Sequence, residues 1–207
     1  NRLITFPSPV VDDHAVRLIK VPNGIYDRGK SRTNRIEAEV VVGGAVSRMK
    51  AWLALPEKDR PTLGVITFNS QQQSLILDLL DAARRDSPDL EWFFSDDRVE
   101  PTIVKNLENV QGDERDFILF SITFWKDAAG KLAMDFGALN RDGGERRLNV
   151  AVTRARQELL VFSGFTADQI DPTRTKALAV QHLKTFLDYA ERGAIALPAQ
   201  DTGSVGG

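Results

Sequence analysis

Apolar residues follow two different spacings along the chain. Short dense or alternating runs rich in β-branched residues predict strands, whereas apolar residues recurring every three or four positions predict helices. On this pattern we expect strands at 16–21, 62–68, 103–107, 117–123 and 158–163. We expect helices from 34 to about 53, at 70–85, around 145–156 and from about 175 to 192. Strands and helices that alternate over short connections predict a mostly parallel sheet in one three-layer α/β domain.

Two short segments add local detail to this pattern. Residues 34–37 read NRIE, a capping-box variant in which Asn34 accepts from an early backbone N–H and Glu37 reaches back to the helix start. Residues 92–97 read WFFSDD and imitate an apolar strand that ends in metal-binding acids. We interpret them instead as a short strand that leaves into an acidic surface turn, and we expect no metal site there.

The segment GIYDRGKS, residues 24–31, satisfies the phosphate-loop pattern G-x-x-x-x-G-K-[ST]. In a working loop Lys30 would contact the β- and γ-phosphates and Ser31 would contact Mg²⁺. That geometry requires a strand running into the glycines and a helix starting within G-K-S. Here the predicted strand ends by Pro22, and the predicted helix begins only at Asn34. A self-sufficient phosphate-loop NTPase is therefore the weakest functional hypothesis.

The amino-acid composition excludes several classes of function. With 42% hydrophobic and 27% charged residues the chain is typical of a soluble globular domain, and no apolar run could span a bilayer. The opening NRLITFPSPV lacks a secretory signal, so we expect a cytoplasmic piece of a longer protein without membrane contact. The chain has no cysteine and two distant histidines, which argues against thiol chemistry, zinc sites and a histidine triad. A net charge of −2 means that any nucleic-acid contact is local.

Three longer segments match one family in order. VKNLENVQGDERDFILFS (104–121) resembles motif V of superfamily 1 helicases, and RRLNVAVTRARQELLVF (146–162) resembles their motif VI. GVITFNSQQQSLI (64–76) is similar to the family's strand-then-helix element with an I-T-x-x-x-x-Q core. SRTNRIEA (31–38) is similar to an element that precedes it in the helicases related to the nonsense-decay and DNA-replication/repair enzymes. Together the matches cover residues 31–163.

The resemblance implies the second, C-terminal RecA-like domain of such a helicase, a P-loop NTPase fold lacking its own P-loop. It would occupy residues 1–192, with an irregular lead-in at 1–15 and a linker-like tail at 193–207. ATP would sit in a cleft shared with an N-terminal RecA-like domain of the parent chain, which would supply the phosphate loop and the Mg²⁺-binding acids. An arginine-bearing Q-Y-R-type element of the family would lie upstream of NRLITFPSP, so we expect one γ-phosphate arginine to be absent.

The resemblance also assigns a nucleotide site. Motif VI makes Arg154 the arginine finger, the one catalytic residue expected, because a guanidinium stabilises phosphate oxygens during phosphoryl transfer. Seven residues earlier, Arg147 would share its helix face. In motif V, Gly112 would allow close approach to phosphate, Glu114 would accept from the ribose hydroxyls and Gln111 would couple the two sites. The alternatives are a solvated Arg154 and an ordinary polar turn at QGDE; Glu158 is the acid that such an arginine could pair with.

Nucleic-acid contacts are implied at two places. The loop after the strand at 62–68 and the approach to motif V carry small polar groups suited to phosphate and sugar rather than to base edges. These residues are Thr67, Asn69, Ser70, Asn106 and Asn109. Each alone could be an ordinary loop residue.

The leading hypothesis is therefore part of an ATP-dependent helicase, an ATP hydrolase that translocates on single-stranded DNA or RNA with ATP and Mg²⁺. The isolated fragment is expected to be inactive. The rival hypothesis is a non-catalytic helicase-like module that only binds nucleic acid or protein. The intact QGDE and TRAR sequences argue against that rival, because a domain without turnover has no physical need to keep those polar groups.

Overall fold

One parallel sheet organises residues 16–192, the part of the chain that the computed structural model describes. It holds five strands in the order β1-β5-β4-β2-β3. The strands are β1 (Val16–Lys20), β2 (Leu63–Thr67), β3 (Ile103–Asn106), β4 (Arg115–Ser121) and β5 (Ala155–Ser163). All adjacent pairs in this sheet are parallel, so their carboxyl ends meet at one edge and their amino ends at the other.

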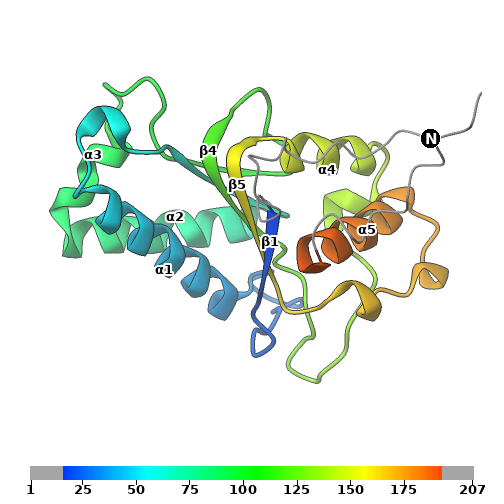
Figure 1. Cartoon of the computed structure of the whole chain (residues 1–207). Helices are drawn as coiled ribbons and strands as arrows, with labels where there is room; N and C mark the ends of the chain where they lie inside the picture. The colour runs from blue at the N-terminus through cyan, green and yellow to red at the C-terminus, as the bar shows by residue number, and fades with distance from the viewer. Residues whose placement is uncertain (1–15, 193–207) are drawn as a thin grey trace, which may run out of the picture.

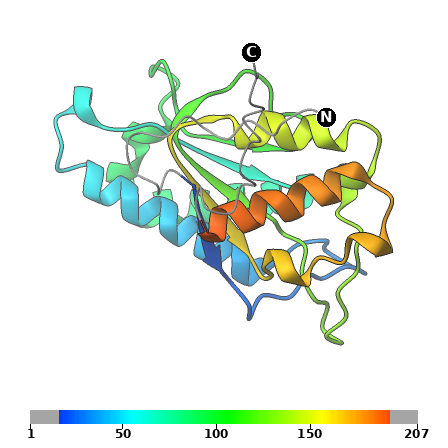
Figure 2. The same ribbon diagram turned by 45° about the vertical axis from the view of Figure 1, so that its right-hand side comes forward.

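Helices cover both faces of the sheet (Figure 1). One face carries α1 (Arg35–Trp52), α2 (Ser70–Asp86) and the short α3 (Glu91–Phe94). The other face carries α4 (Gly144–Val152) and α5 (Leu178–Arg192). In the turned view of Figure 2, α4 and α5 lie together on the opposite side of the strands from α1. The predicted three-layer α/β fold with a mostly parallel sheet is confirmed.

The central strands are apolar on both faces because each face meets a helical layer. Along β4, Phe120 joins the core beneath α4 and α5, whereas its neighbour Leu119 joins the core beneath α1 and α2. Every residue of β2 is buried. This explains why the central strands read as continuous apolar runs, as is typical of parallel sheets covered on both sides.

One predicted boundary is wrong in a way that matters for the site. The sequence pattern extends a helix to Arg156, but α4 ends at Val152 and β5 begins at Ala155. Thr153 caps the helix, and its hydroxyl donates to the Asn149 carbonyl oxygen over 2.9 Å. The chain then turns into the sheet because it pairs with β4, and this long-range pairing overrides the local helical pattern.

Two further predictions differ from the structure. Residues 92–97 do not begin as a strand: Glu91–Phe94 form α3, where Phe93 is buried and Arg98 lies over the ring of Trp92. The last helix starts at Leu178, a little later than expected, and Pro172–Arg174 form a separate 3₁₀ turn before it. The expected lead-in at 1–15 and tail at 193–207 lie outside the described residues.

The described residues include no helix that is long and apolar enough to cross a membrane.

Candidate nucleotide and nucleic-acid sites

The predicted site residues separate onto opposite edges of the sheet. Glu114 directly precedes β4 and Arg154 directly precedes β5, so both lie at the amino edge. There the Arg115 N–H donates to the Arg154 carbonyl oxygen over 3.1 Å. Thr67 ends β2 and Asn106 ends β3 at the carboxyl edge. The structure thus brings the QGDE segment (111–114) beside the TRAR segment (153–156) and places the expected nucleic-acid contacts at the other edge.

Arg154 and Arg147 do not share a helix face, contrary to the expectation, because α4 ends before Arg154. Arg147 Nη1 donates to the carbonyl oxygens of Ala138 over 3.1 Å and Asp142 over 2.9 Å, which fastens α4 to the segment before it. Arg154 Nη2 donates to the Thr153 hydroxyl over 3.2 Å. The two arginines therefore have different surroundings, and only Arg147 is committed to backbone oxygens.

The guanidinium of Arg154 keeps unused hydrogen-bonding capacity. Its buried Nε has no hydrogen-bond partner among residues 16–192, and the same holds for Oδ1 of Asn149. The suggested pairing of Arg154 with Glu158 is wrong, because Glu158 accepts from Arg17 Nε over 3.1 Å. A buried donor without a partner costs about 1–3 kcal/mol, so such groups commonly have a ligand or water as partner.

The QGDE segment is an exposed turn at the same edge. Gly112 has φ +63, in the left-handed region that favours glycine, and a Cβ built there would meet no atom within 4 Å. Gln111, Gly112 and Glu114 are exposed. Buried Arg115 holds the segment in place: Nη1 donates to the Glu114 carbonyl oxygen over 2.7 Å and Nε donates to that of Pro101 over 3.0 Å.

At the carboxyl edge most predicted contact residues are occupied by internal hydrogen bonds. The Thr67 side chain is fully buried, and its hydroxyl donates to the Asn69 carbonyl oxygen over 2.7 Å. Asn106 Nδ2 donates to Gln73 Oε1 over 2.7 Å, and Asn109 Oδ1 accepts from the Asn106 N–H over 2.8 Å. The polar side-chain atoms of these residues are therefore used in internal hydrogen bonds, which hold the edge in shape. The residues are Thr67, Asn106 and Asn109.

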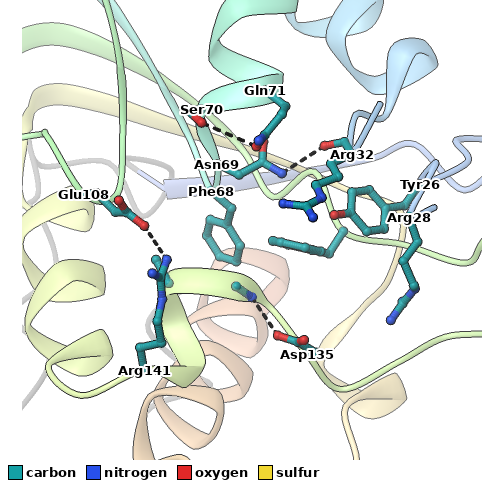
Figure 3. Close-up of a pocket in the computed structure, with 13 residues that line it drawn as sticks. Tyr26, Arg28, Arg32, Phe68, Asn69, Ser70, Gln71, Glu108, Asp135 and Arg141 are labelled. Carbon is teal, nitrogen blue, oxygen red and sulfur yellow. Dashed lines mark hydrogen bonds and ion pairs between the residues drawn. The ribbon is translucent and has the colours of Figure 1, made fainter. Parts of the chain in front are cut away.

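Asn69 and Ser70 line a cavity of about 480 Å³ at this edge (Figure 3). Asn69 also caps α2, since its Oδ1 accepts from the Gln72 N–H over 2.8 Å. Three aromatic rings and three arginines contribute to the lining. They are Tyr26, Phe68, Phe124, Arg28, Arg32 and Arg141.

The loop between β1 and α1 (residues 21–34, the β1–α1 loop) contains GIYDRGKS and forms one wall of this cavity. No helix follows the G-K-S sequence directly, because α1 begins only at Arg35. The Ser31 hydroxyl donates to Asp27 Oδ2 over 2.8 Å, and the Ser31 N–H donates to the same oxygen over 3.0 Å. These two bonds from Ser31 lower the pKa of Asp27. The loop therefore lacks the geometry of a phosphate loop.

A network of buried polar side chains lies next to the carboxyl edge. The sequence did not predict most of its hydrogen bonds. Asn34 does cap α1, with Oδ1 accepting from the Glu37 N–H over 3.1 Å. The Glu37 carboxylate does not complete the capping box; it accepts from the Ser121 hydroxyl over 2.6 Å and the Thr123 N–H over 2.7 Å. The Asn34 N–H donates instead to Gln72 Oε1 over 2.9 Å. Burial raises the pKa of Glu37 to about 7.

Comparison with known proteins identifies the family. The sequence profile of a family described as an AAA domain matches residues 13–164. The chain belongs to this AAA domain family.

Two relatives of this AAA domain are named as helicases. One is called "uncharacterized ATP-dependent helicase MG140", and the other is called its homolog. The Mycoplasma genitalium protein is 34% identical over 195 residues, and the Mycoplasma pneumoniae protein is 33% identical over 198 residues. Each match covers 92% of this chain but 16% of the relative, so the chain spans about a sixth of their length. The resemblance to helicases is confirmed.

A solved structure also aligns with part of this AAA domain. It is the C-terminal domain of a possible DNA helicase from Lactobacillus plantarum, with 15% sequence identity and a TM-score of 0.38. The alignment covers 72% of this chain and 73% of that chain. At this level of similarity no conclusion about function follows.

The amino edge of the AAA domain brings an arginine beside an open backbone turn. Arg154 offers an unpaired buried Nε, and Gly112 leaves the backbone of the QGDE segment open. Two stabilising residues were not predicted from the sequence, Arg115 and Arg156. Arg156 forms ion pairs with Glu100 and Asp116, and the hydrogen bonds that it donates to Glu100 are the largest cause of its raised pKa. No local sequence signal identifies these partners, since they are far apart in the chain.

Proposed function

We propose that this chain is the second, C-terminal RecA-like domain of a cytoplasmic superfamily 1 helicase or translocase, with residues 1–192 forming the domain and 193–207 a linker-like tail. It would bind ATP between its amino edge and an N-terminal RecA-like domain of the same parent chain, and would move along single-stranded DNA or RNA. The observation that carries the proposal is Arg154, whose buried Nε is unpaired beside the exposed QGDE segment.

Each residue of the amino edge has a proposed role in handling ATP. Arg154 would contact the γ-phosphate oxygens, where a fixed cation stabilises the charge of the transition state. Gly112 would let the backbone approach the nucleotide, and the exposed carboxylate of Glu114 would accept from a ribose hydroxyl. Gln111 would link the nucleotide to the strand-binding edge. Arg147 would act indirectly, by fastening α4 to the preceding segment.

Mg²⁺ would supply charge neutralisation on the ATP phosphates, held by acids of the other domain. In this chain Ser31, the residue that the phosphate-loop pattern would assign to Mg²⁺, is bound to Asp27. At the carboxyl edge Asn69 and Ser70 would contact the single strand, and Thr67, Asn106 and Asn109 would hold the edge in shape. Small polar groups of this kind read phosphate and sugar without selecting a sequence.

Substitution of Arg154 in the parent protein tests the proposal. Arg154→Ala should lower the rate of ATP turnover by about 10³-fold, because it removes transition-state charge stabilisation. Steady-state and single-turnover hydrolysis measure the effect, with circular dichroism to check the fold. Arg146→Ala is the matched control, since Arg146 is exposed on α4 and should leave turnover unchanged.

A single-turnover rate near that of the wild type in the Arg154→Ala protein would remove Arg154 from the finger role. If the wild-type parent also failed to hydrolyse ATP while still binding single strands, the non-catalytic interaction module would be the better description.

A further inference from the structure

The β1–α1 loop presents two arginines whose charge is not used within the fold. Arg28 and Arg32 are exposed and line the 480 Å³ cavity at the carboxyl edge. In the described part of the chain neither side chain makes a hydrogen bond or an ion pair; Arg28 only lies over the Tyr26 ring at 5.8 Å. The third arginine of the lining, Arg141, is paired with Glu108. Apart from that pair, the charged side chains of the lining are Arg28, Arg32 and Asp135, so its net positive charge comes from this loop.

Hydrogen bonds hold the loop in a fixed shape. The Arg32 N–H donates to the Asp27 carbonyl oxygen over 2.8 Å, and Asn69 Nδ2 donates to the Arg32 carbonyl oxygen over 2.9 Å. Arg32 has φ +58, a left-handed conformation that is unfavourable for a residue with a Cβ. Backbone strain of this kind persists where the surrounding structure over-determines it, and such positions cluster at binding sites.

The lining favours a phosphate over a base as the ligand. Tyr26 and Phe124 are each 6% exposed and Phe68 is 1% exposed, so their rings offer almost no face for stacking. Asp135 also lines the cavity, and its carboxylate accepts from the Gly137 N–H over 3.0 Å. Guanidinium groups match phosphate oxygens in geometry and charge.

We propose that Arg28 and Arg32 form a phosphate clamp that binds the backbone of the single strand next to Asn69 and Ser70. The inference rests on the proposed function and extends it, because it moves the main strand contact from neutral side chains to the loop that imitates a phosphate loop. The clamp is local, consistent with a net charge of −2 for the chain. It would read no sequence, since a phosphate oxygen is the same at every nucleotide.

Salt-dependent binding of labelled oligo-dT, oligo-dA and oligo-U tests the clamp. The variants are Arg28→Ala, the double Arg28→Ala/Arg32→Ala and the control Lys30→Ala. Lys30 is exposed in the same loop and carries the same charge but does not line the cavity. We expect the double variant to bind about tenfold more weakly and the negative slope of log K against log salt to become shallower by about 1.4, for two lost phosphate contacts. Lys30→Ala should stay within about twofold of the wild type.

The outcomes separate the clamp from the wider proposal. If the double variant bound the strand as tightly as the wild type, the clamp would be overturned, but strand binding itself would stand. If Lys30→Ala and Arg28→Ala lost the same affinity for the strand, the effect would be one of net charge, and the clamp would also be overturned. Displacement of the strand by inorganic phosphate at matched ionic strength would indicate a simple anion site. No binding by the wild type at low salt would remove both the clamp and the strand-binding part of the proposed function. Arg28→Ala alone keeps the test valid if the double variant fails to fold.

Discussion

Glu37 shows how much one residue depends on partners distant in sequence. It is the first-turn acid of α1, where a carboxylate ordinarily faces solvent and interacts with the helix dipole. In this fold it is fully buried, and it accepts from the hydroxyl of Ser121, the last residue of β4, and from the N–H of Thr123 just beyond the strand. Burial disfavours the charged form, and the two hydrogen bonds only partly offset that cost, so the pKa rises to about 7.

This raised pKa predicts a pH-dependent stability. The folded state holds the Glu37 proton up to about pH 7, whereas the unfolded chain loses it near its ordinary value of 4.5. Between these values the folded state binds more protons, so the free energy of unfolding should fall as pH rises, by about 3 kcal/mol in total. Glu37→Gln should abolish this part of the slope, since the amide stays neutral. Urea unfolding at pH 5 and pH 7.5 measures the difference.

Glu39→Gln is the control for this experiment, because Glu39 lies exposed on the same helix and pairs with Arg35. It should leave the pH profile as in the wild type. A Glu37→Gln protein with the full wild-type slope would assign the pH dependence to other groups.

At the scale of elements, α4 fits against its preceding segment without spare room. A Cβ on Gly144, the first residue of α4, would lie 1.9 Å from the Leu139 carbonyl oxygen. Backbone cannot rotate away as a side chain can, so any larger residue here has to displace the helix. Since α4 leads directly to Arg154, its docking sets where that guanidinium lies.

Two glycine substitutions should therefore change stability in opposite directions. Gly144→Ala should lower the free energy of unfolding by about 3 kcal/mol. Gly43→Ala should raise it by about 0.5–1 kcal/mol, because Gly43 is exposed within α1, a Cβ there meets nothing within 4 Å, and alanine favours the helix. Guanidinium denaturation of both variants measures the effect. A Gly144→Ala protein as stable as the wild type would show that α4 shifts freely.

On the scale of the whole molecule, the proposed ATP site would be one wall of a cleft completed by the proposed N-terminal domain. The amino edge supplies arginine and open backbone, and the β1–α1 loop, which carries the phosphate-loop pattern, lies at the carboxyl edge beside the cavity. The chain also spans only about a sixth of its curated relatives. A domain of this kind should depend on a partner domain for turnover.

The 207-residue chain alone should show no ATP hydrolysis above background in the presence of Mg²⁺, and Lys30→Ala should change nothing. A phosphate-release assay with the parent protein as positive control measures this. Mg²⁺-dependent turnover by the chain that Lys30→Ala abolishes would restore GIYDRGKS as a working phosphate loop.

Local sequence patterns were enough to predict the alternation of strands and helices and the cap at Asn34, because apolar spacing and capping chemistry act over a few neighbouring residues. The sequence also placed Arg154 near the QGDE segment through the family's motif order. The long-range fold determines that Arg154 leaves the helix, because pairing with β4 draws the chain into the sheet. It decided that Glu37 meets Ser121, 84 residues away. It likewise assembled the arginine-lined cavity from distant segments. Contacts between distant segments leave no local pattern, so only the folded chain shows them.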